Sequence, residues 1–249
     1  MLNYNGTIYR PPLEAYTLLL PVNEGCSHNR CKFCNMYRDI KFRMLSAAEI
    51  ESWLAEVYRV NGEYCAQLDR VYLVGADPFA VSASNLERVI NLIRKYLPNV
   101  KVISMYAAIR NIMSKSDAQL ERLKNLGVND LYVGVESGLD DVLSHLNKGN
   151  TVADVRRQCQ RLNAVGIRHM SLLMLGADCG LPARRPSADD FDAESRDCKH
   201  GRRTFQQDVS SDSPVKNFPG RFGRGFLFAL TFTDDACAVL WACPTVRSK

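Results

Sequence analysis

The sequence has no hydrophobic run long enough to cross a bilayer, and it lacks the features of an export signal. No stretch approaches the roughly 18 consecutive apolar residues that indicate a transmembrane helix. The first 16 residues contain no basic segment followed by an apolar core, so we expect a cytoplasmic protein. A large charge excess is absent as well, because 32 basic residues face 27 acidic ones over 249 residues. The sequence therefore gives no strong nucleic-acid signal and indicates no membrane partner.

The last part of the chain lacks three residue types that are frequent before it. All ten Tyr, all seven Met and every Ile lie before residue 177. Residues 178–249 also lack helical or strand periodicity, apart from apolar runs at 226–232 and 236–243. We therefore predict a core over residues 1–176 and an anomalous tail over 177–249 that is either disordered or out of frame. Composition favours the second explanation, a shift of the reading frame near Gly176.

Before residue 177, short apolar runs alternate with amphipathic helical segments. Capping boxes mark the helix starts, since Ser46, Ser84 and Ser116 each precede a Glu or Gln by three residues. Repetition of strand and helix with short connections is typical of parallel βα units. The predicted fold class is α/β, with about five βα units and an irregular C-terminal tail. The expected strands are 17–22, 70–74, 100–105, 130–135 and 169–175.

Three of the nine cysteines lie within nine residues, directly after the first expected strand. They are Cys26, Cys31 and Cys34, and three thiolates on one loop can hold a metal centre. A zinc site would need His28 as its fourth ligand, although His28 follows Cys26 more closely than is usual in zinc sites. An iron–sulfur cluster needs no fourth protein ligand if one iron is left open for a substrate or cofactor. The spacing favours iron–sulfur, and zinc remains the alternative.

The stretch GCSHNRCKFCNMY at residues 25–37 resembles the cysteine loop of the radical S-adenosylmethionine (SAM) superfamily, and the resemblance extends from residue 14 to about 176. As in the family, an aromatic residue, Phe33, precedes the last cysteine. The commonest family spacing has three and then two residues between cysteines, whereas this loop has four and then two. The loop looks like that of oxidoreductases related to anaerobic coproporphyrinogen oxidase. The resemblance implies a partial (β/α) barrel of radical SAM type whose three loop cysteines hold a [4Fe–4S] cluster.

The resemblance also implies a SAM site at the strand ends. VGADPF (74–79) takes the place of a family turn that meets the SAM amino group, and VGVESG (133–138) carries an acid that would contact the ribose or methionyl part. The acids and the arginine could instead have a purely structural role, as part of a turn, a surface ion pair or a solvated charge. Lys148 matches a family Lys-Gly pair, but we expect it to serve a helix C-terminus. The expected SAM-binding residues are Gly75, Ala76, Asp77, Arg110, Glu136 and Ser137.

The function implied by the resemblance is reductive cleavage of SAM to a 5′-deoxyadenosyl radical that attacks an unknown substrate. A flavodoxin or ferredoxin would then serve as the electron donor. The family core has six strands and the sequence shows five, so we expect one edge of the sheet to lie open. Two alternatives remain: a non-catalytic zinc- or iron-binding module, and an inactive truncated remnant of such an enzyme.

Overall fold

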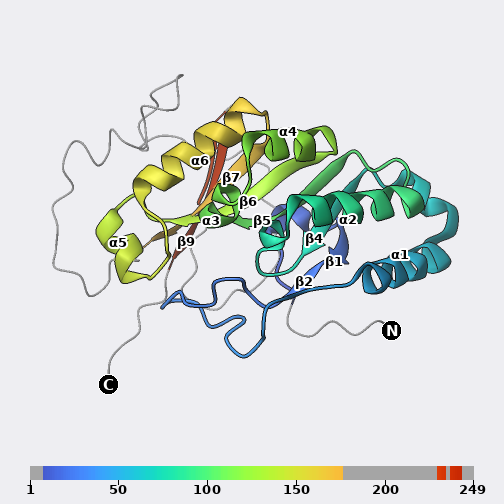
Figure 1. Ribbon diagram of the computed structural model, residues 1–249, viewed down its shortest axis with the longest axis horizontal. Coiled ribbons are helices and arrows are strands. Elements are labelled where there is room, and N and C mark those ends of the chain that lie inside the picture. Colours follow the sequence, from blue (N-terminus) through green and yellow to red (C-terminus); the bar gives the residue numbers. More distant parts are fainter. Residues whose placement is uncertain (1–7, 176–228, 234–235, 243–249) are drawn as a thin grey trace, which may run out of the picture.

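The computed structural model describes residues 8–175, 229–233 and 236–242, and its helices and strands alternate along the core (Figure 1). None of the helices in this described part is long and apolar enough to span a membrane. The elements are the 3-10 helices η1 (Pro12–Glu14), η2 (Gly62–Gln67) and η3 (Pro78–Ala80), the strands β1 (Leu18–Pro21), β2 (Asn23–Glu24), β3 (Arg43–Met44), β4 (Arg70–Val74), β5 (Val102–Ala108), β6 (Val128–Glu136), β7 (Arg168–Leu175), β8 (Ala229–Thr233) and β9 (Ala236–Ala242), and the helices α1 (Ala47–Asn61), α2 (Ala83–Tyr96), α3 (Ile109–Met113), α4 (Asp117–Asn125), α5 (Asp140–His145) and α6 (Val152–Ala164).

One seven-stranded sheet forms the centre of the molecule, in the order β1-β4-β5-β6-β7-β9-β8. The neighbours from β1 to β9 are parallel, and β8 runs antiparallel to β9. The strands β1, β4, β5, β6 and β7 follow one another in space in their chain order. This is the winding of a (β/α) barrel that is left partly open. The predicted α/β class, with five parallel core strands and helices between them, is therefore confirmed.

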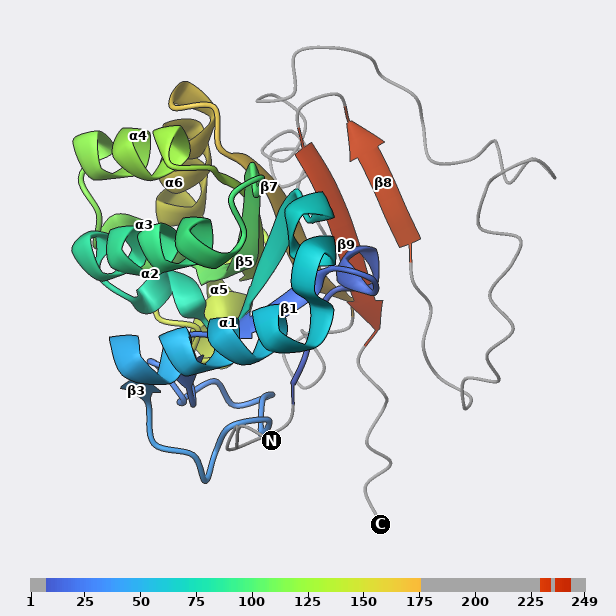
Figure 2. The ribbon, with the colours of Figure 1, turned by 90° about the vertical axis from the view of Figure 1, so that its right-hand side faces the viewer.

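Two strands from the tail occupy the sheet edge that the sequence led us to expect open. β9 pairs with β7 in parallel register, from His169 opposite Ala236 to Leu175 opposite Ala242, and β8 lies on its outer side (Figure 2). The apolar run at 236–243 thus supplies the strand beside β7, and the run at 226–232 overlaps β8. The expectation of an open edge at β7 is wrong, because β9 pairs with that edge. The rest of the predicted tail lies outside the described residues.

Side-chain caps set the helix starts, with one correction to the sequence prediction. Ser46 and Ser116 form the expected capping boxes at α1 and α4. At α2, Ser82 rather than Ser84 is the N-cap, because its hydroxyl accepts a hydrogen bond from the backbone N–H of Asn85. Ser84 therefore lies inside the first turn, and the helix begins earlier than the Ser-Glu spacing predicted.

The helices cover one face of the sheet and bury the main hydrophobic core against it (Figure 2). The opposite face carries a smaller apolar cluster that includes Tyr72 and Tyr132. The rings of Tyr72, Tyr106 and Tyr132 meet edge to face, with centroids 5.9, 6.1 and 6.0 Å apart. Edge-to-face contacts of this kind stabilise aromatic clusters beyond the area that they bury. The inner face of the partial barrel therefore carries three packed tyrosines among aliphatic residues, whereas its outer face is mostly aliphatic.

A buried carboxylate joins the amino ends of β4 and β6. Glu14, which is fully buried, accepts hydrogen bonds from Arg70 Nε at 3.0 Å, the Thr17 hydroxyl at 2.6 Å and the Tyr132 hydroxyl at 2.7 Å. Arg70 also pairs with Asp130 at 2.7 Å. Burial raises the pKa of Glu14, but these hydrogen bonds outweigh burial and the pKa falls to about 2. The ionised form of Glu14 therefore stabilises the fold.

We expect Glu14→Gln to lower the free energy of unfolding at pH 7 by about 3 kcal/mol, because the change breaks a buried ion pair. In the wild type, this contribution is fully present above the unfolded-state pKa near 4.5 and is lost as the pH falls towards 2. Urea unfolding at pH 7 and at pH 3 measures it, and the two proteins should differ less at pH 3. An equal difference at both pH values would contradict the prediction. Glu56→Gln, in an exposed pair with Arg59, is the control.

Candidate functional site

The carboxyl ends of β1, β4, β5 and β6 lie at one edge of the sheet, because these strands are parallel. Beyond β1, the antiparallel pair β2–β3 closes the base of residues 25–42, here called the thiol loop. The loop, drawn in blue, runs along this edge towards α5 (Figure 1). Asp77 follows β4, Arg110 follows β5, and Glu136 ends β6. The structure therefore brings the residues predicted from the sequence to the same edge.

The three cysteines of the thiol loop are free and partly exposed. Burial raises the pKa of the Cys26 thiol, and the charge of Asp77 raises it further. Burial also raises the pKa of the Cys31 thiol, although the ammonium of Lys148 opposes the rise. Cys26 and Cys31 are therefore protonated at neutral pH in the metal-free protein, and a metal would bind them only with release of these protons.

The thiol loop carries three candidate thiol ligands and, for the zinc alternative, His28 as a fourth. Among the described residues, no three His, Cys, Asp or Glu side chains are grouped so that they could hold one metal ion. Nε2 of His28, the fourth ligand in the zinc alternative, lies 2.7 Å from the carbonyl oxygen of Asn147. In a [4Fe–4S] cluster each thiolate binds a different iron, so the three thiols need not converge on one atom. Three partly exposed thiols on one tethered loop fit that requirement.

The segment after α5 holds the first half of the thiol loop. The N–H of Lys32 donates to the carbonyl of Leu146 at 2.9 Å. The side-chain amide of Asn147 donates to the carbonyl of Arg30 at 2.9 Å, while its own carbonyl meets His28. Asn147 has φ +53°, a conformation that Asn tolerates better than most residues. The loop is therefore fixed against the α5–α6 connection.

Asp77 is buried beneath the thiol loop, with 3% of its surface exposed. It accepts hydrogen bonds from the backbone N–H of Ser27 at 3.1 Å and from the Ser27 hydroxyl. Nη2 of Arg110 lies 3.6 Å from the Asp77 carboxylate and 3.4 Å from the Ser27 hydroxyl. Burial raises the pKa of Asp77, and the contacts with Ser27 and Arg110 oppose that rise. Asp77 thus holds the residue next to Cys26, and Arg110 is paired rather than solvated.

The other residues predicted around Asp77 and Glu136 are Gly75, Ala76 and Ser137. A Cβ on Gly75 would lie 1.9 Å from the side-chain oxygen of Asn23, so no larger residue fits there. Ala76, which follows, is half-buried. The Ser137 hydroxyl accepts a hydrogen bond from the N–H of Leu139 at 3.2 Å and so stabilises a turn after β6. The roles of these residues in SAM binding stay predictions.

Glu136 ends β6 at a β-bulge and pairs with Lys148. The two charged groups lie 2.7 Å apart, and the side chains are 12% and 10% exposed. The Lys148 ammonium also lies 5.8 Å from the ring centroid of Phe33 in the thiol loop. Gly134 makes room for the pair, because a Cβ there would lie 2.8 Å from Glu136 Oε1 and 2.9 Å from Lys148 Nζ. Lys148 also stands at the end of α5, where its backbone N–H donates to the carbonyl of Leu143 at 3.0 Å, and the pairing of its ammonium with Glu136 was not predicted.

Three residues at this edge had no role in the sequence analysis: Ser27, Arg38 and Asn147. Ser27 lies within the thiol loop and ties it to Asp77, Asn147 holds the loop from outside, and Arg38 bonds to the loop backbone from within. The signal for Asn147 was its position before Lys-Gly at a helix end, where a left-handed residue is common. Nothing in the sequence marked Ser27 or Arg38 as a partner of distant groups.

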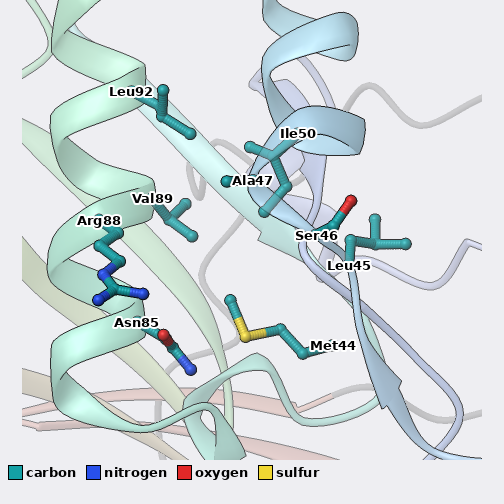
Figure 3. A pocket seen from close by; sticks show the side chains of 9 residues that line it. All are labelled: Met44, Leu45, Ser46, Ala47, Ile50, Asn85, Arg88, Val89 and Leu92. Carbon is teal, nitrogen blue, oxygen red and sulfur yellow. The ribbon is translucent and has the colours of Figure 1, made fainter.

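A separate cavity of about 280 Å³ lies between the amino-terminal turns of α1 and α2 (Figure 3). Its walls are mostly apolar, with Arg88 and Asn85 contributed by α2. None of the residues predicted to bind SAM or metal lines it. The lining residues are Met44, Leu45, Ser46, Ala47, Ile50, Asn85, Arg88, Val89 and Leu92.

The fold and the thiol loop define an α/β partial barrel with a three-cysteine metal motif at its strand ends. The sequence matches the Radical SAM superfamily over residues 20–178, and because this is more than half of the chain, the chain belongs to that superfamily. It is 29% identical to the heme chaperone HemW of Bacillus subtilis (strain 168) over 110 residues. The aligned stretch covers 44% of this chain and 29% of that protein. It is also 25% identical to HemW of Lactococcus lactis subsp. lactis (strain IL1403) over 152 residues. That alignment covers 61% of this chain and 39% of the relative.

Among solved structures, the cobalamin-dependent S-adenosylmethionine radical enzyme OxsB aligns with a TM-score of 0.54 at 18% identity, over 64% of this chain and 24% of that one. At that identity the likeness confirms the fold alone. The cofactors of the superfamily are a [4Fe–4S] cluster and SAM, and membership assigns both to this chain. The chain spans less than two fifths of each curated relative.

Proposed function

We propose that this protein is a radical SAM enzyme that binds a [4Fe–4S] cluster through Cys26, Cys31 and Cys34 and cleaves SAM reductively. The main support for this proposal is the thiol loop itself, which is held at the strand ends by Asp77 on one side and by Asn147 on the other. When bound, the cluster supplies one electron to the sulfonium of SAM, which gives methionine and a 5′-deoxyadenosyl radical that takes hydrogen from the substrate. The reductant is an external electron donor, such as a flavodoxin or ferredoxin. We place the protein in the cytoplasm, where thiols stay reduced.

The protein groups bind and orient SAM at the edge of the sheet. Because the Asp77 carboxylate already serves Ser27 and Arg110, we assign the SAM amino group to the backbone carbonyls of Gly75 and Ala76. Arg110 remains close enough to the thiol loop to meet the SAM carboxylate. Glu136 keeps its second oxygen, Oε2, for a hydroxyl or ammonium of SAM while Oε1 binds Lys148. Ser137 stands beside Glu136 at the same mouth.

Anaerobic reconstitution with iron and sulfide tests the proposal. We expect about four irons and four sulfides per chain, and their loss in Cys31→Ala, because an open iron leaves only three protein ligands. Cys65→Ala is the matched control, since this thiol is buried in the core away from the loop. Reduction with dithionite in the presence of SAM should then release 5′-deoxyadenosine. Zinc in place of iron, or equal loading of both variants, would overturn the proposal.

The names of the two curated relatives favour a second candidate, the binding of heme. Added heme that binds a defined site gives a narrow Soret band, whereas a [4Fe–4S] cluster absorbs broadly across the visible range. Titration of the metal-free protein with heme separates the two. A saturable Soret change that survives in Cys31→Ala would make heme the ligand of a different site.

The tail beyond Gly176 carries a proposal of its own, a shift of the reading frame. The superfamily match ends at residue 178, within two residues of the change in composition. We expect the coding DNA near codon 176, read with a one-base shift, to continue the alternation of strand and helix. Resequencing the gene and translating the other frames checks this. If neither shifted frame continues the βα pattern, residues 177–249 are the native continuation.

A further inference from the structure

The guanidinium of Arg38 bridges two of the three cysteines of the thiol loop. Its terminal nitrogen Nη2 donates to the carbonyl oxygen of Cys31 at 3.1 Å and to that of Cys34 at 2.9 Å. This nitrogen carries two N–H bonds, so it can serve both acceptors. The N–H of Cys34 also donates to the carbonyl of Cys31 at 3.3 Å. One backbone bond and one side chain therefore hold this pair of cysteines in a single turn.

The backbone that carries Arg38 is itself fixed. The side-chain amide of Asn29 donates to the carbonyl of Tyr37 at 2.8 Å and to that of Arg38 at 3.2 Å. Tyr37 is 5% exposed, and its ring meets the ring of Tyr9 edge to face, with centroids 5.7 Å apart. Arg38 thus extends from an anchored point, and its side chain has less freedom to lose when it binds the two carbonyls.

The same network reaches the first cysteine. The backbone N–H of Asn29 lies 3.4 Å from the sulfur of Cys26 and points to it, while the side chain of Asn29 binds the backbone beside Arg38. Asn29 has φ +49°, which turns the chain between Cys26 and Cys31. All three cysteines are therefore connected through two residues of the loop, Asn29 and Arg38.

We propose that Arg38 is a positioning residue of this metal centre, which fixes Cys31 and Cys34 relative to each other and keeps a positive charge beside their backbone. The proposal deepens the function proposed above and rests on it for the identity of the metal centre. Three thiolates and a cluster carry net negative charge, which increases by one when the cluster is reduced. A guanidinium stays protonated at every accessible pH, so it favours the reduced form. Hydrogen bonding and charge near the cysteines are known levers on such potentials.

The metal-free protein gives the first test, because the Arg38 bridge exists without metal. Hydrogen exchange of the thiol-loop backbone should become about tenfold faster in Arg38→Met, since Cys34 and its neighbours lose one of their two constraints. Lys41→Met is the matched control: it removes the same charge from an exposed position of the same loop. We expect its exchange to match the wild type. Equal exchange rates in Arg38→Met and Lys41→Met would overturn the proposal that Arg38 fixes Cys31 and Cys34 relative to each other.

The reconstituted protein gives the second test, the midpoint potential of the cluster, which a purely structural role of Arg38 would leave unchanged. Titration with dithionite adds one electron per cluster, and the midpoint potential should become more negative in Arg38→Met by about 59 mV, a tenfold change for a one-electron couple. Arg38→Lys keeps the charge and should restore most of the potential. A potential unchanged in Arg38→Met, or lowered equally in Lys41→Met, would overturn the proposed role. Failure of the wild type to load iron would instead refute the function, while the exchange result would still stand.

Discussion

Replacement of Gly25 by alanine should prevent closure of the thiol loop and reduce iron loading at least tenfold, while the sheet stays folded. Gly25 has φ +65°, and a Cβ there would lie 2.6 Å from the carbonyl oxygen of Ile40 and 2.8 Å from the carbonyl carbon of Lys41. These atoms belong to the backbone at the far end of the loop, so no side chain can rotate away. The clash falls directly beside the β2–β3 pair that closes the loop. Iron and sulfide per chain measure loading, and circular dichroism measures the fold.

The control for Gly25→Ala is another glycine with a positive φ and free space around it. Gly62 has φ +53°, and a Cβ there would meet nothing within 4 Å. Gly62 has ψ −125°, outside the left-handed helical region, so Gly62→Ala carries only the conformational penalty of an L residue in a backbone region that favours glycine, about 1 to 3 kcal/mol. We expect it to load iron like the wild type. If the two variants load equally, the close approach of the backbone is not what fixes the loop.

The fold was predictable because each element of the core carries local signals. Capping boxes at Ser46 and Ser116 and apolar strands between them gave the βα alternation directly. The choice of Ser82 over Ser84 was not readable, because both serines can cap and only packing of the helix decides between them. The pairing of β9 with β7 was missed for a related reason. Strand pairing joins residues far apart in sequence, and composition does not specify which apolar run reaches an edge.

The sequence predicted the sheet edge at which the candidate residues lie, but not their contacts. Asp77 was expected to face SAM, and in the structure it holds Ser27, fifty residues earlier in the chain. Lys148 was expected at a helix end, and besides standing there its ammonium neutralises Glu136. Such pairings follow from burial, since a charge removed from water needs a partner wherever the fold supplies one. The sequence places charges at strand ends, and the tertiary structure decides which of them bind each other.

Lys148→Met should be the most destabilising substitution of a charged residue at this edge, with a loss of about 3 to 5 kcal/mol in the free energy of unfolding. The change leaves the Glu136 carboxylate largely buried without its partner. Burial lowers the pKa of Lys148, but the charge of Glu136 outweighs burial and the pKa rises, so the ammonium is charged at neutral pH. Urea unfolding at pH 7 measures the loss. Lys95→Met, which breaks an exposed pair with Glu51, is the control and should change little.

The double variant Lys148→Met/Glu136→Gln separates the pair from the packing around it. With both charges removed, no ion is left buried alone, so we expect much of the lost stability to return. Recovery would show that the pair serves to place charge at the site more than to stabilise the fold. SAM affinity should then stay low in the double variant although its stability is restored, because Glu136 no longer offers a carboxylate at the end of β6. If affinity returns together with stability, Glu136 holds the fold at this edge and does not bind SAM.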